Sequence, residues 1–178
     1  MNSINLYLQD KIDVETVRPL IQRIIEENVL LEVEKEDELS TCSADLINLY
    51  ITSVGGSVHD GFALADVILN SKIPINTYCV GYADSTAFFV YLAGKERYAY
   101  EHSMFLIHNI LSSIEDSTPT GLKSYTDYVE KLQNWEYELF EQRTGKDYTL
   151  LYNVFTYDKQ LRLTAQEALE HNIVTEII

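Results

Sequence analysis

The sequence predicts an α/β fold with a largely parallel sheet, contained in a single domain. Apolar runs of strand length alternate along the chain with segments in which apolar residues recur at helical spacing. With 178 residues, of which 46% are hydrophobic, the chain can build one complete core. Since neither an internal repeat nor a linker is evident, we expect residues 1–178 to form one domain.

The first half of the chain is expected to fold as alternating strands and helices. Its apolar runs predict strands over residues 4–8, 46–52 and 75–80. Helical spacing predicts helices over residues 16–26, 59–71 and 85–93. Asp13 can cap the first helix, whereas the acidic and polar segment 32–43 is expected to be a solvated loop.

The second half continues this alternation and contains the longest helix. The same patterns predict strands over residues 97–100, 104–107 and 173–178, and helices over residues 122–143, 149–155 and 164–172. Gly145 can close the long helix, and Thr164 with Glu167 near the capping-box position can open the last one. Asn172 is expected to end that helix in the left-handed conformation, and segment 114–121 is expected to be a polar loop.

The composition is strongly acidic, with a net charge of −15 and a sequence pI of about 4.5. This charge argues against nucleic acid and anionic membranes as partners, because both require clustered lysine and arginine. Cys42 and Cys79 occur without a CxxC or Cys/His spacing, so neither a disulfide framework nor a metal site is expected. No apolar run reaches membrane-spanning length and no signal-peptide pattern is present, so we expect a cytoplasmic protein.

Ser85 and His108 are the strongest candidates for catalytic residues. Ser85 lies where a strand turns into an apolar helix, within the stretch Gly-Tyr-Ala-Asp-Ser-Thr-Ala-Phe of residues 81–88. His108 follows the apolar run 104–107, at the end of another strand. A serine and a histidine in such positions can meet, which is the minimum for a nucleophile with a general base. Taken alone, Ser85 could be a helix cap and His108 a structural residue.

A Gly-Gly turn, Ser-Val-Gly-Gly-Ser-Val at residues 53–58, follows another buried strand. Its glycines let the backbone turn sharply and expose N–H groups, as an oxyanion hole or a phosphate site requires. By itself such a motif more often marks an ordinary turn. The catalytic interpretation therefore depends on this turn, Ser85 and His108 occurring together.

Together these motifs resemble those of the ClpP family of self-compartmentalised serine peptidases, from about Ile4 to Ile178. The matching stretches are LYITSVGGSV at 49–58, GYADS at 81–85, FLIH at 105–108 and LTAQEA at 163–168. The resemblance implies a ClpP/crotonase-like superhelix of repeated ββα units with a protruding handle helix. It also implies a serine endopeptidase that cleaves unfolded polypeptides or short peptides inside an oligomeric chamber, without a metal or a cofactor.

The resemblance assigns a role to four residues of the chain. Ser85 would attack the scissile carbonyl, and His108 would take its proton and later deliver it to the leaving amine. The backbone N–H groups of Gly56 and Thr86 would hold the oxyanion.

The third catalytic residue of the family, an aspartate before the last helix, has two candidate positions in this chain. Counting forward from Gly145 leads to Asp158, whereas counting back from Thr164 leads to Gln160. Asp158 is chosen because it is the one acid in segment 148–166. It could also be an ordinary loop aspartate, and a site without an acid stays open.

Several residues around the serine depart from the family pattern. Val54 replaces the usual proline of the Gly-Gly turn, and Asp84 replaces a small residue before the serine. Thr86 replaces a methionine, so the pocket beside the serine is expected to differ in shape. Val58 and Leu111 are candidates for contacts with the bound peptide, which the family holds as an added strand.

The resemblance also implies a homo-oligomer of stacked heptameric rings, with the long helix between the rings. In the family, a segment ahead of the first strand lines the axial pore and helps to dock an ATP-driven unfoldase. Here the first strand is expected to begin at Ile4, which argues against an unfoldase partner, although apolar surface pockets could still bind one.

Two other interpretations stay open. The chain could be a ring subunit whose active site is impaired by the substitutions around Ser85, with a structural or regulatory role. Labelling of Ser85 by a fluorophosphonate separates that subunit from an active peptidase. The chain could also be an acyl-CoA enzyme of the related crotonase fold, in which carboxylates and backbone N–H groups act instead of a Ser–His pair.

Overall fold

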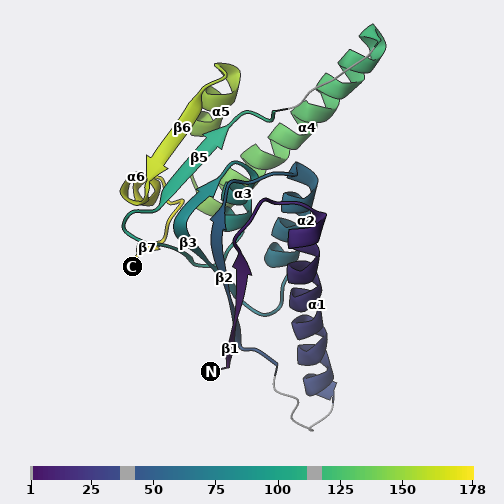
Figure 1. Ribbon diagram of the computed structural model, residues 1–178, viewed down its shortest axis with the longest axis vertical. Coiled ribbons are helices and arrows are strands. Elements are labelled where there is room, and N and C mark those ends of the chain that lie inside the picture. The colour runs from purple at the N-terminus through teal and green to yellow at the C-terminus, as the bar shows by residue number, and fades with distance from the viewer. Residues whose placement is uncertain (1, 37–42, 112–117) are drawn as a thin grey trace.

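A seven-stranded sheet organises the chain, and helices pack on it (Figure 1). The computed structural model describes residues 2–36, 43–111 and 118–178. The strands are β1 (Ser3–Leu8), β2 (Leu46–Ser53), β3 (Ile75–Asp84), β4 (Arg97–Ala99), β5 (Met104–His108), β6 (Gln160–Thr164) and β7 (Glu176–Ile177). The helices are α1 (Val14–Glu36), α2 (Val58–Leu69), α3 (Thr86–Leu92), α4 (Pro119–Thr144), α5 (Thr149–Thr156) and α6 (Ala165–Glu170). This alternation, with mostly parallel strand pairs, confirms the predicted α/β class.

The sheet divides at β3, which has two different neighbours along its length. The main path is β1-β2-β3-β4-β7, while β5 pairs with β3 and β6 pairs with β5. β3 pairs with β4 through residues 77–79 and with β5 through residues 82–84. Between the two halves, Gly81 has a φ of 91°, a conformation that glycine adopts without steric cost. The division therefore brings the end of β3 beside β5, where Ser85 and His108 lie.

Strand β6 lies in a segment for which no strand was expected. It pairs antiparallel with β5, whereas the other strand pairs of the described sheet are parallel. Its five residues alternate, but only Leu163 is buried, so its apolar signal is weak. Its register places Gln160 opposite His108. Strand β7 is shorter than the run 173–178 predicted.

Helix α1 is longer than its sequence pattern predicts. Asp13 caps its start as predicted, because Asp13 Oδ1 accepts hydrogen bonds from the N–H groups of Glu15 (3.0 Å) and Thr16 (3.1 Å). The expected loop was wrong for residues 32–36, which are helical, while residues 37–42 lie outside the described residues. Glutamate and lysine are good helix formers, so an acidic, polar segment can continue a helix that is already nucleated.

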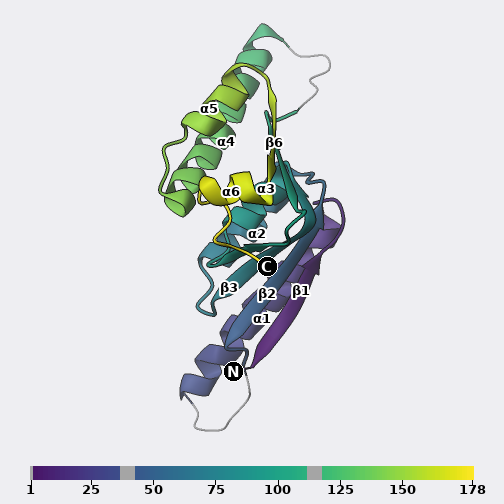
Figure 2. The same ribbon diagram turned by 90° about the vertical axis from the view of Figure 1, so that its left-hand side faces the viewer.

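Helix α4 provides the protruding handle that the resemblance implied. It begins at Pro119 rather than at residue 122, with Thr118 as its N-cap, and Gly145 ends it in the left-handed conformation. Its buried residues begin only at Leu132. The first half of α4 therefore projects from the body of the protein, as Figures 1 and 2 show from two sides.

Helix α3 lies at the centre of the core and fixes the turn that precedes it. All seven of its residues are buried, and Phe88 and Tyr91 are among the largest fully buried side chains. Both rings pack against Phe105 of β5, at centroid distances of 6.3 and 5.0 Å. Since buried aromatic side chains contribute strongly to core stability, the position of Ser85 is set by the core.

The last helix and the C-terminal segment follow the predicted pattern. Thr164 and Glu167 form a reciprocal capping box, and Asn172 has a φ of 58°. Buried Arg97 holds this segment, because its guanidinium donates hydrogen bonds to the carbonyl oxygens of Ile173 (2.8 Å) and Asn172 (3.0 Å).

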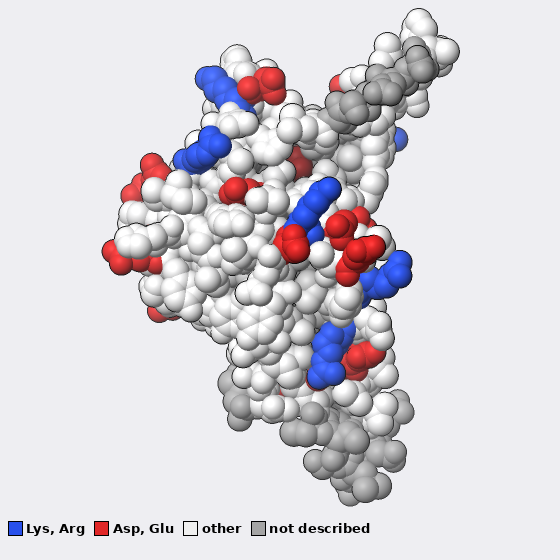
Figure 3. Space-filling view, viewed as in Figure 1, with Lys and Arg blue, Asp and Glu red and all other residues white. Residues whose placement is uncertain are grey.

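The surface carries charges of both signs despite the acidic composition. Figure 3 shows lysine and arginine next to aspartate and glutamate along the side formed by α1 and α2. Within the described part of the chain, no helix is both long enough and apolar enough to cross a membrane.

Candidate active site

Ser85 occupies a strained turn between β3 and α3. Its φ of 55° and ψ of −128° are unusual for a residue with a side chain, and such strain is typical of functional sites. Its N–H group donates a 2.7 Å hydrogen bond to the carbonyl oxygen of Leu106 on β5. Ser85 does occupy the N-cap position of α3, but its side chain makes no capping hydrogen bond to the helix. The turn thus holds the backbone while the hydroxyl stays available.

The Gly-Gly turn packs directly against Ser85. A Cβ atom on Gly55, whose φ is 83°, would lie 2.6 Å from the Asp84 carbonyl oxygen and 2.8 Å from the Ser85 Cβ. The Thr86 hydroxyl donates a 3.2 Å hydrogen bond to the Gly56 carbonyl oxygen. No side chain larger than that of glycine fits at Gly55 without displacing the serine turn.

The N–H groups of Gly56 and Thr86 are not used by the neighbouring secondary structure. The bridge between Ile12 and the Gly-Gly turn uses the Gly55 carbonyl and the Ser57 N–H group instead. Thr86 is the first residue of α3, and first-turn N–H groups have no carbonyl partner within their helix. Both groups are therefore able to donate to a ligand.

His108 is oriented by a backbone carbonyl. Its Nδ1 lies 2.6 Å from the carbonyl oxygen of Asn109, and because a carbonyl can only accept, Nδ1 carries the proton. In neutral imidazole this leaves Nε2 with a free lone pair, as a general base requires. Asn109 is itself held, since its amide donates to the Phe155 carbonyl oxygen (3.3 Å) and its Oδ1 accepts from Gln133.

One cavity of about 290 Å³ brings these groups together. Six of the seven predicted site residues line it: Gly56, Val58, Ser85, Thr86, His108 and Leu111. Lys11, Phe89 and Glu136 also line it. Both Ser85 and His108 line the cavity, and among the described residues no hydrogen bond joins them.

Asp158, the seventh predicted site residue, is not brought to this cavity. It lies in the turn between α5 and β6, exposed and with a φ of 48°. Within the described chain no hydrogen bond or ion pair links Asp158 to His108. The residue opposite His108 is Gln160, whose side-chain oxygen accepts a 3.2 Å hydrogen bond from Arg162.

Asp84, whose charge was expected from the sequence to act on His108, is a carboxylate near that histidine. It is the last residue of β3 and pairs with Leu106, two residues before His108 on the same face of β5. Burial raises the pKa of Asp84, while the backbone of Leu106 and the charges of Arg162 and His108 oppose that rise. In the sequence, only its position directly before Ser85 connected Asp84 with the site.

Glu136 is a residue that the sequence prediction missed. It lies on α4, is only 3% exposed, and its Oε2 has no hydrogen-bond partner among the described residues. Burial alone raises its pKa from 4.5 to about 8. Glu136 is four residues from Leu132 and from Phe140, on the buried face of α4. A glutamate at a position where the helical pattern expects an apolar residue is the sequence signal that could have identified it.

The described residues offer no obvious metal or thiol chemistry. No group of three or more histidine, cysteine, aspartate or glutamate side chains in residues 2–36, 43–111 and 118–178 is placed to hold a metal ion. Cys79 is buried, and burial raises the pKa of its thiol to about 12, which keeps it protonated.

Comparison with known proteins gives the family. A family model for Clp protease matches residues 4–178 of the chain. The chain belongs to the Clp protease family. It is 28% identical over 175 residues to a protein named ATP-dependent Clp protease proteolytic subunit 1 from Prochlorococcus marinus (strain MIT 9312), covering 97% of this chain and 83% of that protein.

A solved structure confirms that the fold is that of ClpP. The structure of a point mutant of ClpP1 from Listeria monocytogenes matches with a TM-score of 0.77 at 20% sequence identity. The match covers 98% of this chain and 90% of the other. The predicted resemblance to the ClpP family is thus confirmed for both family and fold.

Proposed function

We propose that this Clp protease family member is a serine endopeptidase that cleaves unfolded polypeptides or short peptides. The observation that carries the proposal is the shared cavity, which is lined by Ser85, His108 and the two residues of the oxyanion site. Within the described part of the chain, no hydrogen bond uses the Ser85 hydroxyl. A nucleophile, a base and an oxyanion site are the three parts that acyl transfer requires.

In this mechanism, Ser85 Oγ attacks the scissile carbonyl carbon while Nε2 of His108 takes the hydroxyl proton. The N–H groups of Gly56 and Thr86 donate to the oxygen that becomes negative. When the intermediate collapses, His108 delivers the proton to the leaving amine, and a water molecule then hydrolyses the acyl-serine by the same route. Val58 and Leu111, at the rim of the cavity, would contact the peptide backbone as it is added beside the site.

The orientation of His108 is where this site differs from a complete triad. The Asn109 carbonyl can fix the tautomer and the ring, but as a neutral group it stabilises the imidazolium less than a carboxylate does. Asp158 remains the acid nominated by the sequence, and its participation requires the turn before β6 to move toward His108. No step of the reaction needs a metal or a cofactor.

The proposed working form is a homo-oligomer of stacked rings that encloses the active sites in a chamber. Leu122 and Trp135 of α4 are 47% and 49% exposed, which suits a helix that packs against another subunit. The name of the Prochlorococcus relative includes ATP dependence, which favours an ATP-driven unfoldase as a further partner. A cytoplasmic location is consistent with such an assembly.

The lack of hydrogen bonds from His108 to Ser85 or to an acid, among the described residues, favours a second function. Because Ser85 does not bond to His108 and no acid bonds to His108 among the described residues, the chain could instead be an impaired subunit with a structural or regulatory role in the ring. Both functions use the same fold, so only reactivity separates them.

Fluorophosphonate labelling tests the choice directly. Wild-type protein is expected to be labelled at Ser85, Ser85→Ala to stay unlabelled, and His108→Ala to react roughly a hundredfold more slowly, as loss of a general base predicts. Ser3→Ala, at an exposed serine of β1, is the matched control and should label like the wild type. A folded wild-type oligomer that does not label at all would support the impaired subunit.

A further inference from the structure

Glu136 is the one acidic residue among the described residues that line the Ser85 cavity. The apolar residues Phe89 and Val58 line the same cavity, and the pKa of Glu136 is raised by burial alone. Lys11 also borders the cavity, but no ion pair joins Lys11 to Glu136 within the described chain. The cavity thus contains a buried acid with no basic partner among these residues.

Folding alone does not explain this carboxyl group. A buried carboxyl without a hydrogen-bond partner costs stability, and an apolar residue of similar volume at the same place would usually stabilise the fold. Oε2 is buried and unsatisfied, and no lysine or arginine of the described residues pairs with it. Residues that reduce stability in this way are expected at functional sites, where a ligand can supply the missing partner.

We propose that Glu136 makes this cavity a specificity pocket for a basic side chain, so that the peptidase cleaves next to lysine or arginine. The inference deepens the proposed function and rests on it. A lysine ammonium or arginine guanidinium entering beside Ser85 would give the Glu136 carboxylate the charged hydrogen bonds that it lacks. Buried carboxylates select basic side chains in the same way in trypsin-like proteases.

The size and protonation of the pocket fit this role. A volume of about 290 Å³ is at the low end for ligand pockets, which suits one side chain better than a whole small molecule. Because burial raises the pKa of Glu136 to about 8, the empty pocket holds a neutral acid at neutral pH. A cation that enters favours the ionised form, so binding a basic side chain releases a proton.

Four fluorogenic peptides that differ only in the residue before the cleaved bond test the proposal: lysine, arginine, glutamine and norleucine. Norleucine keeps the whole carbon stem of lysine and lacks the charge. For the wild type, kcat/KM for lysine is expected to exceed that for norleucine by roughly 30-fold or more. In Glu136→Gln this ratio is expected to fall toward one.

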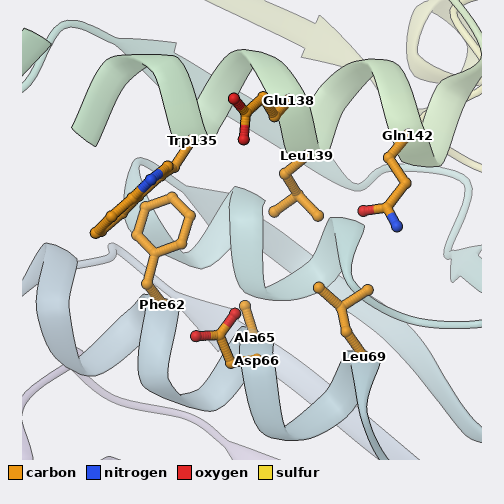
Figure 4. A pocket seen from close by; sticks show the side chains of 8 residues that line it. All are labelled: Phe62, Ala65, Asp66, Leu69, Trp135, Glu138, Leu139 and Gln142. Carbon is orange, nitrogen blue, oxygen red and sulfur yellow. The ribbon is translucent and has the colours of Figure 1, made fainter. Parts of the chain in front are cut away.

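Glu138→Gln is the matched control. Glu138 lies two residues further along α4 and borders a different cavity of about 250 Å³ between α2 and α4, together with Phe62, Leu69 and Trp135 (Figure 4). The same loss of charge there is expected to leave the lysine-to-norleucine ratio unchanged. An equal fall of the ratio in both variants would overturn the proposal.

The outcomes separate this inference from the proposed function. If wild type cleaves peptides in a Ser85-dependent way but prefers norleucine, or if Glu136→Gln keeps the preference for lysine, the pocket inference is overturned and the peptidase stands. If no peptide is cleaved, n-butylguanidine binding decides the inference. It should raise the melting temperature of wild type and Glu138→Gln but not of Glu136→Gln, and no difference between them would overturn it.

Discussion

Glu27 and Glu136 are equally buried glutamates on two different helices, and they differ in their partners. Each is 3% exposed. Glu27 on α1 forms an ion pair with Arg23 one turn earlier and accepts a 3.0 Å hydrogen bond from the N–H group of Ala44. Glu136 on α4 has no hydrogen-bond partner for its Oε2 in the described part of the chain, and burial alone raises its pKa.

This difference in partners distinguishes a carboxylate that stabilises the fold, Glu27, from one that is available to bind a ligand, Glu136. Glu27 ties α1 to the segment leading into β2, so its charge is used within the chain. Glu136 lies at the wall of the cavity that also contains Ser85. Equal burial therefore does not mean an equal role, and the partners of a buried charge are the more informative observation.

Replacing Glu136 should give the largest change in stability. Its folded-state pKa of about 8 lies above the ordinary value of 4.5, so between these pH values the unfolded chain releases a proton that the folded chain keeps. The free energy of unfolding then falls as pH rises, by about 1.4 kcal/mol per pH unit. Glu136→Met is expected to gain about 3 kcal/mol at pH 8 and much less at pH 5.

Urea unfolding of wild type and Glu136→Met at the two pH values measures this gain. An equal gain at pH 5 and pH 8 would mean that Glu136 is not protonated in the folded state. The proposed difference between Glu136 and Glu27 would then be contradicted.

The same substitution at Glu27 should have the opposite sign. Glu27→Met removes the acceptor of the Ala44 N–H group and the partner of Arg23, whose side chain is 46% exposed and can return to water. The remaining cost is an unpaired buried N–H group, so a loss of about 2 kcal/mol is expected. Urea unfolding at pH 8 measures it, and a stabilised Glu27→Met would contradict the distinction between the two glutamates.

Asp158 extends the comparison to an exposed acid and should give the smallest effect. Because no hydrogen bond or ion pair joins it to His108 in the described chain, Asp158→Asn is expected to change kcat/KM for any cleaved peptide by less than about twofold. A loss of a hundredfold or more would restore Asp158 as the third catalytic residue and would show that the turn before β6 moves during catalysis.

Much of the fold was predictable because its core elements have strong local signals. The apolar run before Ser85 and the helix after it were both predicted, and the positions of Ser85 and His108 at strand ends indicated that they can meet. Strand β6 was missed because its stability comes from pairing with β5 rather than from its own pattern. The length of α1 was missed because polarity was taken as a sign of a loop.

The missed parts of the site depend on contacts between distant segments. The division of the sheet at Gly81 places Asp84 near His108. The local sequence pattern does not predict that one strand pairs with two different neighbours. Glu136 lies 51 residues after Ser85 and reaches the cavity only because α4 packs on α3. The choice of Asp158 relied on counting, whereas the register of β6 is what places Gln160 opposite His108.

Hydrolysis of a short fluorogenic peptide by wild type and Ser85→Ala, with the mass of each sample measured by size-exclusion chromatography, tests the central claim most directly. A large wild-type oligomer is expected to cleave the peptide, and a Ser85→Ala oligomer of the same mass is expected to have lost this activity completely. Turnover that persists in Ser85→Ala, or an intact wild-type oligomer that cleaves no peptide, would contradict the claim that Ser85 and His108 form a working peptidase site.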